Sequence, residues 1–145
     1  MHRVELRPLF GDVDAMNVVY YGNYLRFFEQ GRAELMRASG CPYRLLADQG
    51  LHLPAVEAGL RYLRPAHYDD LIAVETSVAW LKRASLLFSY RILGPDGQGG
   101  ERELVLGFTK HGCVDQKGKV QPLPAVVRRA LQRHLEEKNQ WVVAR

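Results

Sequence analysis

Two acidic residues, Asp12 and Asp14, are the side chains of this sequence best placed to do chemistry. They lie in a segment rich in residues that favour turns and caps, and Asn23 opens a pattern of helical spacing shortly afterwards. A carboxylate before a helix N-terminus faces free backbone amides and the positive end of the helix dipole. These groups together supply what hydrolysis of an acyl compound needs, namely a nucleophile or base and donors for the developing oxyanion.

The sequence leaves two routes open for Asp14. Its carboxylate either attacks the carbonyl carbon and forms an anhydride, or accepts a proton from an attacking water. From the residue types alone, a role for Asp14 in capping the loop is the simpler interpretation. We expect Asp12 to fix the loop by binding local amides and Asn23 to be the N-cap of the helix.

Basic residues elsewhere in the sequence are candidates for binding an anionic ligand. Lys82 and Arg83 are expected on a tight turn between strands, where long basic side chains can hold phosphates, although a solvated turn is the alternative. Arg61 and Arg64 are further candidates, or else they cover apolar surface with their stems. Ser85 is a small residue suited to a position near the ligand, or an ordinary hydroxyl at a strand start.

The histidines and cysteines do not predict a metal or redox site. The five histidines lack the spacing of metal ligands, and Cys41 and Cys113 form no CxxC pair. His111 and Cys113 share one face of a strand by parity and are a candidate dyad, although such a pair is more typical of an ordinary sheet surface. No Gly-x-Ser-x-Gly motif is present, which argues against a serine hydrolase of the α/β type. We therefore expect no metal and no cofactor.

The composition is that of one globular domain spanning residues 1–145. The chain is 47% hydrophobic, and its apolar runs are only a few residues long, so we expect no membrane association. The N-terminal residues lack the pattern of a secretory signal, and a cytoplasmic location is expected. The net charge of +4 favours anionic partners in general. Nucleic acid is not expected, because the arginines near the C-terminus accompany no recognition motif.

The hydrophobic periodicity predicts an α+β fold. The expected elements are a strand over residues 2 to about 10, a long helix from Asn23 closed by Gly40, a short helix from Pro42 to about Gln49, strands between Leu53 and Val114 with a turn at 94–97, and a C-terminal helix from Pro124 to about Glu137. The later strands are expected to pair antiparallel in sequence order. The single long helix must fill the concave face of the sheet, which is the hotdog arrangement.

Four stretches of the sequence resemble the 4-hydroxybenzoyl-CoA thioesterase family. They are FGDVDAMNVVYYGNY at 10–24, FFE at 27–29, YLRPAHYDD at 62–70 and WLKRAS at 80–85. The resemblance covers most of the chain apart from the last helix. It implies a hotdog fold, dimers whose sheets join edge to edge, frequent tetramers, and active sites between protomers.

The resemblance also implies roles for individual residues. The second acid of the Asp-x-Asp pattern, here Asp14, would act on the thioester carbonyl, and backbone amides around Tyr21, Gly22 and Asn23 would lie near its oxygen. The residues expected to bind substrate are Asn17, Asn23, Arg61, Lys82, Arg83 and Ser85. Two positions depart from the family: Asn17 stands where many members carry glycine, and Tyr21 stands where a subgroup carries histidine, which points toward the aromatic-acyl branch.

The sequence thus predicts a homo-oligomeric acyl-CoA thioesterase, either a dimer or a tetramer. A noncatalytic module that binds acyl-CoA or lipid is the alternative. A dehydratase is disfavoured because no histidine lies between Arg3 and Leu51. The acyl group is left open, because the aromatic residues at the start of the helix either line a pocket or pack in the core: Tyr20, Tyr21, Tyr24, Phe27 and Phe28.

Overall fold

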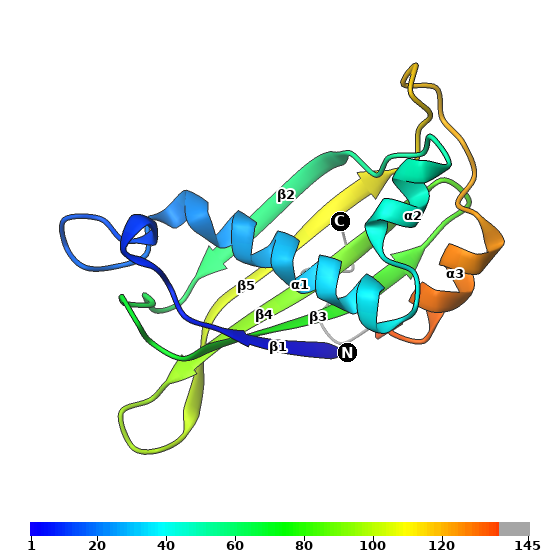
Figure 1. Ribbon diagram of the computed structural model, residues 1–145. Coiled ribbons are helices and arrows are strands. Elements are labelled where there is room, and N and C mark those ends of the chain that lie inside the picture. The colour runs from blue at the N-terminus through cyan, green and yellow to red at the C-terminus, as the bar shows by residue number, and fades with distance from the viewer. Residues whose placement is uncertain (137–145) are drawn as a thin grey trace.

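The computed structural model describes residues 1–136 and shows one antiparallel sheet with a long helix lying across one face (Figure 1). The strands are β1 (His2–Leu6), β2 (Ala55–Tyr62), β3 (Ile72–Leu81), β4 (Ser85–Pro95) and β5 (Glu101–Gly112). The helices are η1 (Phe10–Asp12), η2 (Tyr21–Asn23), α1 (Tyr24–Ala38), α2 (Tyr43–Asp48) and α3 (Ala125–Gln132), of which η1 and η2 are single 3₁₀ turns. The predicted α+β arrangement around one central helix is confirmed.

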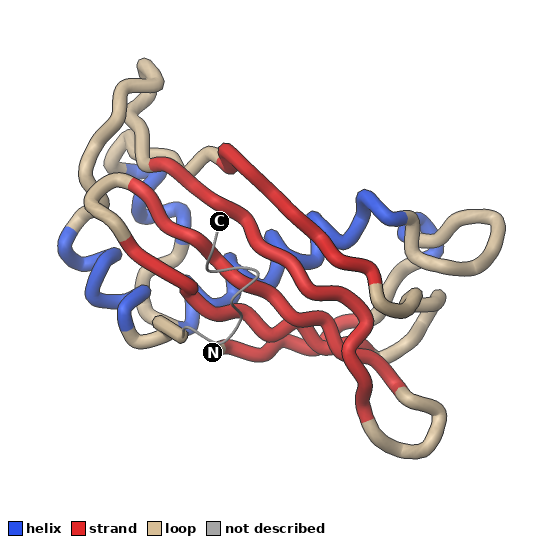
Figure 2. The backbone as a smooth tube through the Cα atoms, turned by 180° about the vertical axis from the view of Figure 1, so that it is seen from behind, coloured by secondary structure: helices blue, strands red, loops and turns tan. Residues whose placement is uncertain are grey.

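The strand order in the sheet is β1-β3-β4-β5-β2, so β1 and β2 are the two edges. The expectation that the later strands pair in sequence order is correct for β3, β4 and β5 but wrong for β2, which pairs with β5. The chain leaves β2 through the loop at 63–71 and crosses toward the opposite edge of the sheet, where β3 lies between β1 and β4. This crossover leaves the outer side of β2 as an open edge, as the view from behind shows (Figure 2).

Helix α1 forms where predicted, and its apolar face makes the centre of the core. Phe27, Phe28, Leu35 and Met36 are almost completely buried against the sheet. The helical spacing of the apolar residues also places Leu25 on this face, but its side chain is 40% exposed. The helix ends as expected at Gly40, whose φ of 77° lies in the left-handed region that glycine adopts at helix ends.

The helix approaches the sheet most closely at Gly31. A Cβ atom added to Gly31 would lie 2.4 Å from Thr76 Oγ1 and 2.8 Å from Val74 Cγ1, both on β3. Real Cβ atoms do not come this close to a neighbour. Glycine is therefore the residue that lets α1 lie directly on the central strands.

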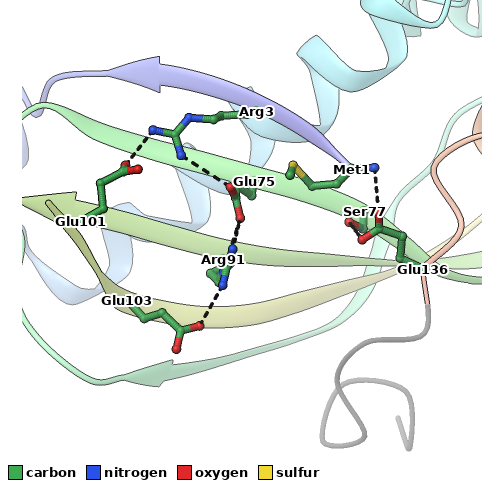
Figure 3. Close-up of polar contacts among 8 residues, drawn as sticks. All are labelled: Met1, Arg3, Glu75, Ser77, Arg91, Glu101, Glu103 and Glu136. Atoms are coloured by element: carbon green, nitrogen blue, oxygen red, sulfur yellow. Dashed lines mark hydrogen bonds and ion pairs between the residues drawn. The ribbon is translucent and has the colours of Figure 1, made fainter.

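Charged residues of alternating sign cross the outer face of the sheet, opposite α1 (Figure 3). Arg3 of β1 contacts Glu101 at 2.7 Å and Glu75 at 3.5 Å. Arg91 of β4 contacts the same Glu75 at 2.6 Å and Glu103 at 3.7 Å. The ladder joins four strands, but surface pairs of this kind contribute only about 0–1 kcal/mol each.

The chain after α3 differs from the prediction. The helix ends at Gln132, whereas it was expected to run to about Glu137, a residue that lies outside the described part of the chain. Helical spacing predicts Leu135 on the apolar face of this helix, whereas in the structure it forms a parallel bridge with Val78 of β3. Backbone bonds from the Val78 amide to the His134 carbonyl and from the Glu136 amide to the Val78 carbonyl hold this segment at the sheet edge beyond β1. The segment pairs with β3 instead of continuing the helix, because the edge of β3 has backbone groups there that need hydrogen-bond partners.

Two strand ends also differ from the prediction. Strand β1 ends at Leu6, because Pro8 cannot donate to a ladder and the chain turns into η1. Strands β4 and β5 extend to Pro95 and from Glu101, so the turn spans 96–100 and not 94–97. Asp96 fixes that turn by accepting the amides of Gln98 and Gly100 at 2.7 and 3.0 Å.

The close approach at Gly31 gives a test of the packing. Replacing Gly31 with alanine should lower the free energy of unfolding by about 1–2 kcal/mol, because overpacking at contacts this short costs about 2–3 kcal/mol, the upper part of the usual range, and the better helix propensity of alanine returns about 1 kcal/mol. The exposed neighbour provides a control, since Gln30→Ala should change stability by less than about 0.5 kcal/mol. Urea unfolding measures both variants, and a Gly31→Ala protein as stable as wild type would contradict the packing argument.

Candidate active site

Asp12 is the residue that organises the loop before α1. It is 5% exposed, its Oδ2 accepts the Leu9 amide at 2.7 Å, and its Oδ1 pairs with Arg26 of α1. The Asp12 backbone carbonyl accepts the Tyr20 amide at 2.9 Å and the side-chain amide of Asn23 at 3.0 Å. The expectation that Asp12 binds a local amide is confirmed, and its contacts tie the loop to the first turns of the helix.

Asp14 lies on the exposed part of the same loop. Its Oδ1 accepts the Met16 amide at 2.8 Å and the Val18 amide at 3.4 Å, which is a local turn of the kind that aspartate favours. Its Oδ2 makes no hydrogen bond to any residue between 1 and 136 in this structure. One oxygen therefore holds the side chain in place and the other is available to a ligand.

The residues that follow Asp14 lead into the helix N-terminus. Asn17 has a φ of 61°, a conformation that asparagine tolerates and that explains why glycine is suited to this position. Tyr21 and Gly22 begin the 3₁₀ turn η2, where the amides have no acceptor within the helix. Asn23 occupies the N-cap position, but the prediction of a capping side chain is wrong, because that side chain donates to the Asp12 carbonyl.

A groove of about 240 Å³ lies beside this helix start. Its lining residues are Val19, Tyr21, Tyr24, Tyr62, Leu63, Arg64 and Pro65. The Tyr62 hydroxyl donates to the Tyr21 carbonyl at 2.9 Å, which joins the end of β2 to the helix start. Of the aromatic residues whose role was open, Tyr24, Phe27 and Phe28 are core residues, whereas Tyr20 and Tyr21 are exposed.

The basic residues predicted to bind phosphates lie at two different places. Arg61 is exposed near the end of β2, at the same end of the sheet as Tyr21. Lys82 and Arg83 form the turn between β3 and β4, and Ser85 is the first residue of β4. That turn is at the opposite end of the sheet from the Asp14 loop (Figure 1). Within one chain, Asp14 and Asn17 share a loop at the same end of the sheet as Tyr21, Gly22 and Asn23, and Lys82, Arg83 and Ser85 lie at the other end.

A second cavity of about 330 Å³ lies between α1, α2 and the sheet, at the Lys82 end. Its lining residues are Glu29, Arg32, Ala33, Met36, Tyr43, Leu53, Phe88 and His111. The volume falls in the range of small-ligand pockets, and the walls combine apolar side chains with a few polar groups. The sequence interpretation missed this cavity, because helical spacing marks Glu29 and Arg32 only as part of a solvated face.

A chain of hydrogen bonds runs beneath the cavity. His111 donates from Nδ1 to the Leu53 carbonyl at 2.9 Å, and its Nε2 lies 2.8 Å from the Thr109 hydroxyl. Thr109 Oγ1 is 2.6 Å from the Tyr90 hydroxyl, and Arg32 Nη1 is 3.5 Å from that same hydroxyl. Burial lowers the pKa of His111 to about 4, so the imidazole is neutral at pH 7 and accepts the Thr109 proton at Nε2.

The candidate dyad of His111 and Cys113 does not form. Both ring nitrogens of His111 are engaged by Leu53 and Thr109, and the Cys113 thiol points toward the Pro122 carbonyl at 3.9 Å. Burial raises the pKa of the Cys113 thiol, which disfavours a nucleophilic thiolate. Residues 1–136 contain no group of three or more histidine, cysteine or acidic side chains able to hold a metal ion.

None of the helices in the described part of the chain is long and apolar enough to span a bilayer. The family model described as the thioesterase-like superfamily matches residues 8–131. The chain belongs to this family, which confirms the resemblance found in the sequence.

Individual relatives agree with this assignment. The acyl-CoA thioesterase YbgC of Haemophilus influenzae is 35% identical over 121 residues, which cover 81% of this chain and 83% of the relative. The structure of a gentisyl-coenzyme A thioesterase is 28% identical, with a TM-score of 0.79 over 90% of this chain and 99% of that one. A 4-hydroxybenzoyl CoA thioesterase complex, 20% identical with a TM-score of 0.82 over 90% of this chain and 97% of that one, shares the hotdog fold.

The buried histidine predicts a specific pH dependence of stability. The folded pKa of about 4 lies below the unfolded value of about 6.5, so the unfolded chain binds the extra proton between these values. The free energy of unfolding should therefore fall as the pH drops from 7 to 4, by about 3 kcal/mol from this group. His111→Gln should remove this part of the pH dependence, measured by urea unfolding at each pH; equal slopes in both proteins would contradict the assignment.

Proposed function

We propose that this protein is an acyl-CoA thioesterase in which Asp14 acts on the thioester carbonyl. The observation that carries the proposal is the loop geometry: Asp12 ties the loop to the helix start, and Asp14 retains one carboxylate oxygen without a partner in the described structure. Membership of the thioesterase-like superfamily and the printed functions of the relatives support this assignment. A cytoplasmic location remains a prediction from the sequence.

The chemistry follows from groups on one short segment. The thioester oxygen would accept hydrogen bonds from the amides of Tyr21 and Gly22, where the helix dipole also stabilises negative charge. The Asp14 carboxylate either adds to the carbonyl carbon or takes a proton from a water that adds to it. Collapse of the tetrahedral intermediate releases the CoA thiolate, which is then protonated. In the direct route, water cleaves the Asp14 anhydride and restores the carboxylate.

Binding of the CoA phosphates by Lys82 and Arg83 requires a second copy of the chain. The open side of β2 provides a backbone edge, and antiparallel pairing of two β2 strands would place the Tyr62 end of one against the Ala55 end of the other. This pairing brings the Asp14 loop of one protomer to the Lys82 end of its partner. The site would then be shared between two protomers.

Two features support the proposed pairing. The loop from Leu9 to Tyr21 exposes large apolar side chains, with Phe10 at 79% and Met16 at 80% exposed, which a monomer rarely leaves in water. The cavity lined by Glu29, Arg32 and His111 lies at the end of β2 that would receive the loop of the partner. We propose that this cavity takes the acyl group, while the turn of Lys82 and Arg83 beside it holds the phosphates.

A noncatalytic acyl-CoA-binding module is the second candidate. It would use the same cavity and the same basic turn, and Asp14 would then serve only its turn with Met16. Release of free thiol from acyl-CoA distinguishes the two, because a binding module gives none. A screen across short, long, branched and aromatic acyl groups also defines the substrate.

The role of Asp14 can be tested by substitution. Asp14→Asn should lower kcat by about two to four orders of magnitude, or about 3–5 kcal/mol of transition-state stabilisation, and leave the fold intact because asparagine keeps an oxygen for the Met16 amide. Asp12→Asn should reduce kcat less, although it weakens the pair with Arg26 and lowers stability. Thiol release and circular dichroism check both variants. Near wild-type turnover by folded Asp14→Asn would refute the catalytic role.

The oligomeric state is the second test. Light scattering at micromolar concentration should give at least twice the mass of one chain. Val56 is 62% exposed on the open edge strand β2. Val56→Lys should weaken this assembly and reduce thiol release in parallel, because like charges would face each other across the two β2 strands. The same change at Val126 of α3, 53% exposed and away from that edge, should do neither. A fully active monomer would exclude a shared site.

A further inference from the structure

Helix α3 contacts the turn that is proposed to bind the CoA phosphates. Arg128 Nη2 donates to the Lys82 carbonyl at 2.6 Å and lies 3.2 Å from the Arg83 carbonyl. One guanidinium nitrogen therefore binds two successive carbonyls of the turn. The family resemblance in the sequence did not extend to this helix, and nothing in the helical pattern sets Arg128 apart from Arg129 or Arg133.

The rest of the turn is held by the backbone. The Leu123 amide donates to the Arg83 carbonyl at 2.9 Å, the Cys113 amide to the Ala84 carbonyl at 2.9 Å, and the Lys82 amide to the Ser85 carbonyl at 2.8 Å. Arg128 is the only side chain of the described residues that donates to the Lys82 carbonyl, and it shares the Arg83 carbonyl with Leu123. Loss of Arg128 would leave the Lys82 carbonyl without this donor.

The side chains at this turn are basic and have no acidic partner among the described residues. Lys82 Nζ lies 4.5 Å from the centre of the Trp80 ring, and Lys110 Nζ lies 5.8 Å from the same centre. No ion pair joins Lys82, Arg83 or Lys110 to an acidic residue within residues 1–136. The turn therefore presents uncompensated positive charge whose backbone is fixed from α3.

We propose that Arg128 is a positioning residue for nucleotide binding, which fixes the Lys82–Arg83 turn and neutralises carbonyl oxygens that would otherwise repel a phosphate. This inference rests on the proposed function. A carbonyl oxygen carries partial negative charge, and a guanidinium donor bound to it cancels that charge at short range. Arg128 acts through the turn, since its donor is already bound to the two carbonyls.

The experiment compares substrates with and without the nucleotide. Arg128→Gln should raise KM for acyl-CoA by about five- to tenfold, as expected for hydrogen bonds from a charged group, with kcat unchanged. KM for the matching acyl-pantetheine, which lacks the nucleotide, should not change. Arg128→Lys, which retains charge and a donor, should recover part of the loss. Binding of free CoA, measured by calorimetry, should weaken by the same factor and does not depend on turnover.

Arg129 is the matched control. It is exposed, lies next to Arg128 on the same helix, and makes no hydrogen bond or ion pair with the part of the chain described. Arg129→Gln removes the same charge and should change KM by less than about twofold. Thermal unfolding of each variant shows whether the protein remains folded, and an effect of Arg128→Gln through general instability would lower the apparent kcat for acyl-CoA and acyl-pantetheine alike.

The outcomes separate this inference from the function on which it rests. The double variant of Lys82→Ala and Arg83→Ala should raise KM for acyl-CoA by about tenfold and spare acyl-pantetheine. If wild type binds CoA but releases no thiol from acyl-CoA, the proposed thioesterase activity is refuted. The calorimetric measurement of CoA binding would then still test the role of Arg128. Three outcomes would each overturn the proposal for Arg128. The double variant could raise KM while Arg128→Gln does not, or Arg129→Gln could raise KM as much as Arg128→Gln does. The third is that wild type does not bind CoA.

Discussion

The packing of α1 onto the middle of the sheet is the constraint on which the rest of the molecule depends. It buries Phe27, Phe28 and Leu35 at once, and it is possible only because Gly31 lets the helix backbone approach β3. A helix held this closely has its N-terminus fixed at one end of the sheet. The loop before it must then be anchored to the same place, which the bonds of Asp12 to Leu9, Arg26 and Asn23 accomplish.

Polar groups inside this core are arranged by the same constraint. Phe28 stacks on Tyr90 with ring centres 4.2 Å apart, which places the Tyr90 hydroxyl beside Thr109 and next to Arg32 of the helix. The row of bonds that continues to His111 gives Tyr90, Thr109 and His111 hydrogen-bond partners, so the desolvation cost of burying these three side chains is offset. Burial nevertheless disfavours the charged imidazole, and the interior therefore favours a neutral row of donors and acceptors.

The sequence predicted the features that depend on local pattern. The long helix, the short helix α2, and the turn of Lys82 and Arg83 all follow from periodicity and turn residues close in the chain. The features it missed depend on contacts between distant residues. The pairing of β2 with β5, the bridge of Leu135 with Val78, and the cavity above His111 are set by which backbone edges and side chains meet after the chain has crossed the sheet. The same holds for Arg128, which is 45 and 46 residues from its partners.

The separation of the Asp14 loop from the Lys82–Arg83 turn, at opposite ends of one sheet, has a consequence for genetics. In the proposed dimer, each site takes its aspartate from one protomer and its basic turn from the other. A chain defective in Asp14 and a chain defective in the basic turn, made in the same cell, would form mixed dimers in which one site carries both defects and the other carries neither. Two impaired alleles of this gene would thus complement each other, whereas two alleles that damage the same end would not.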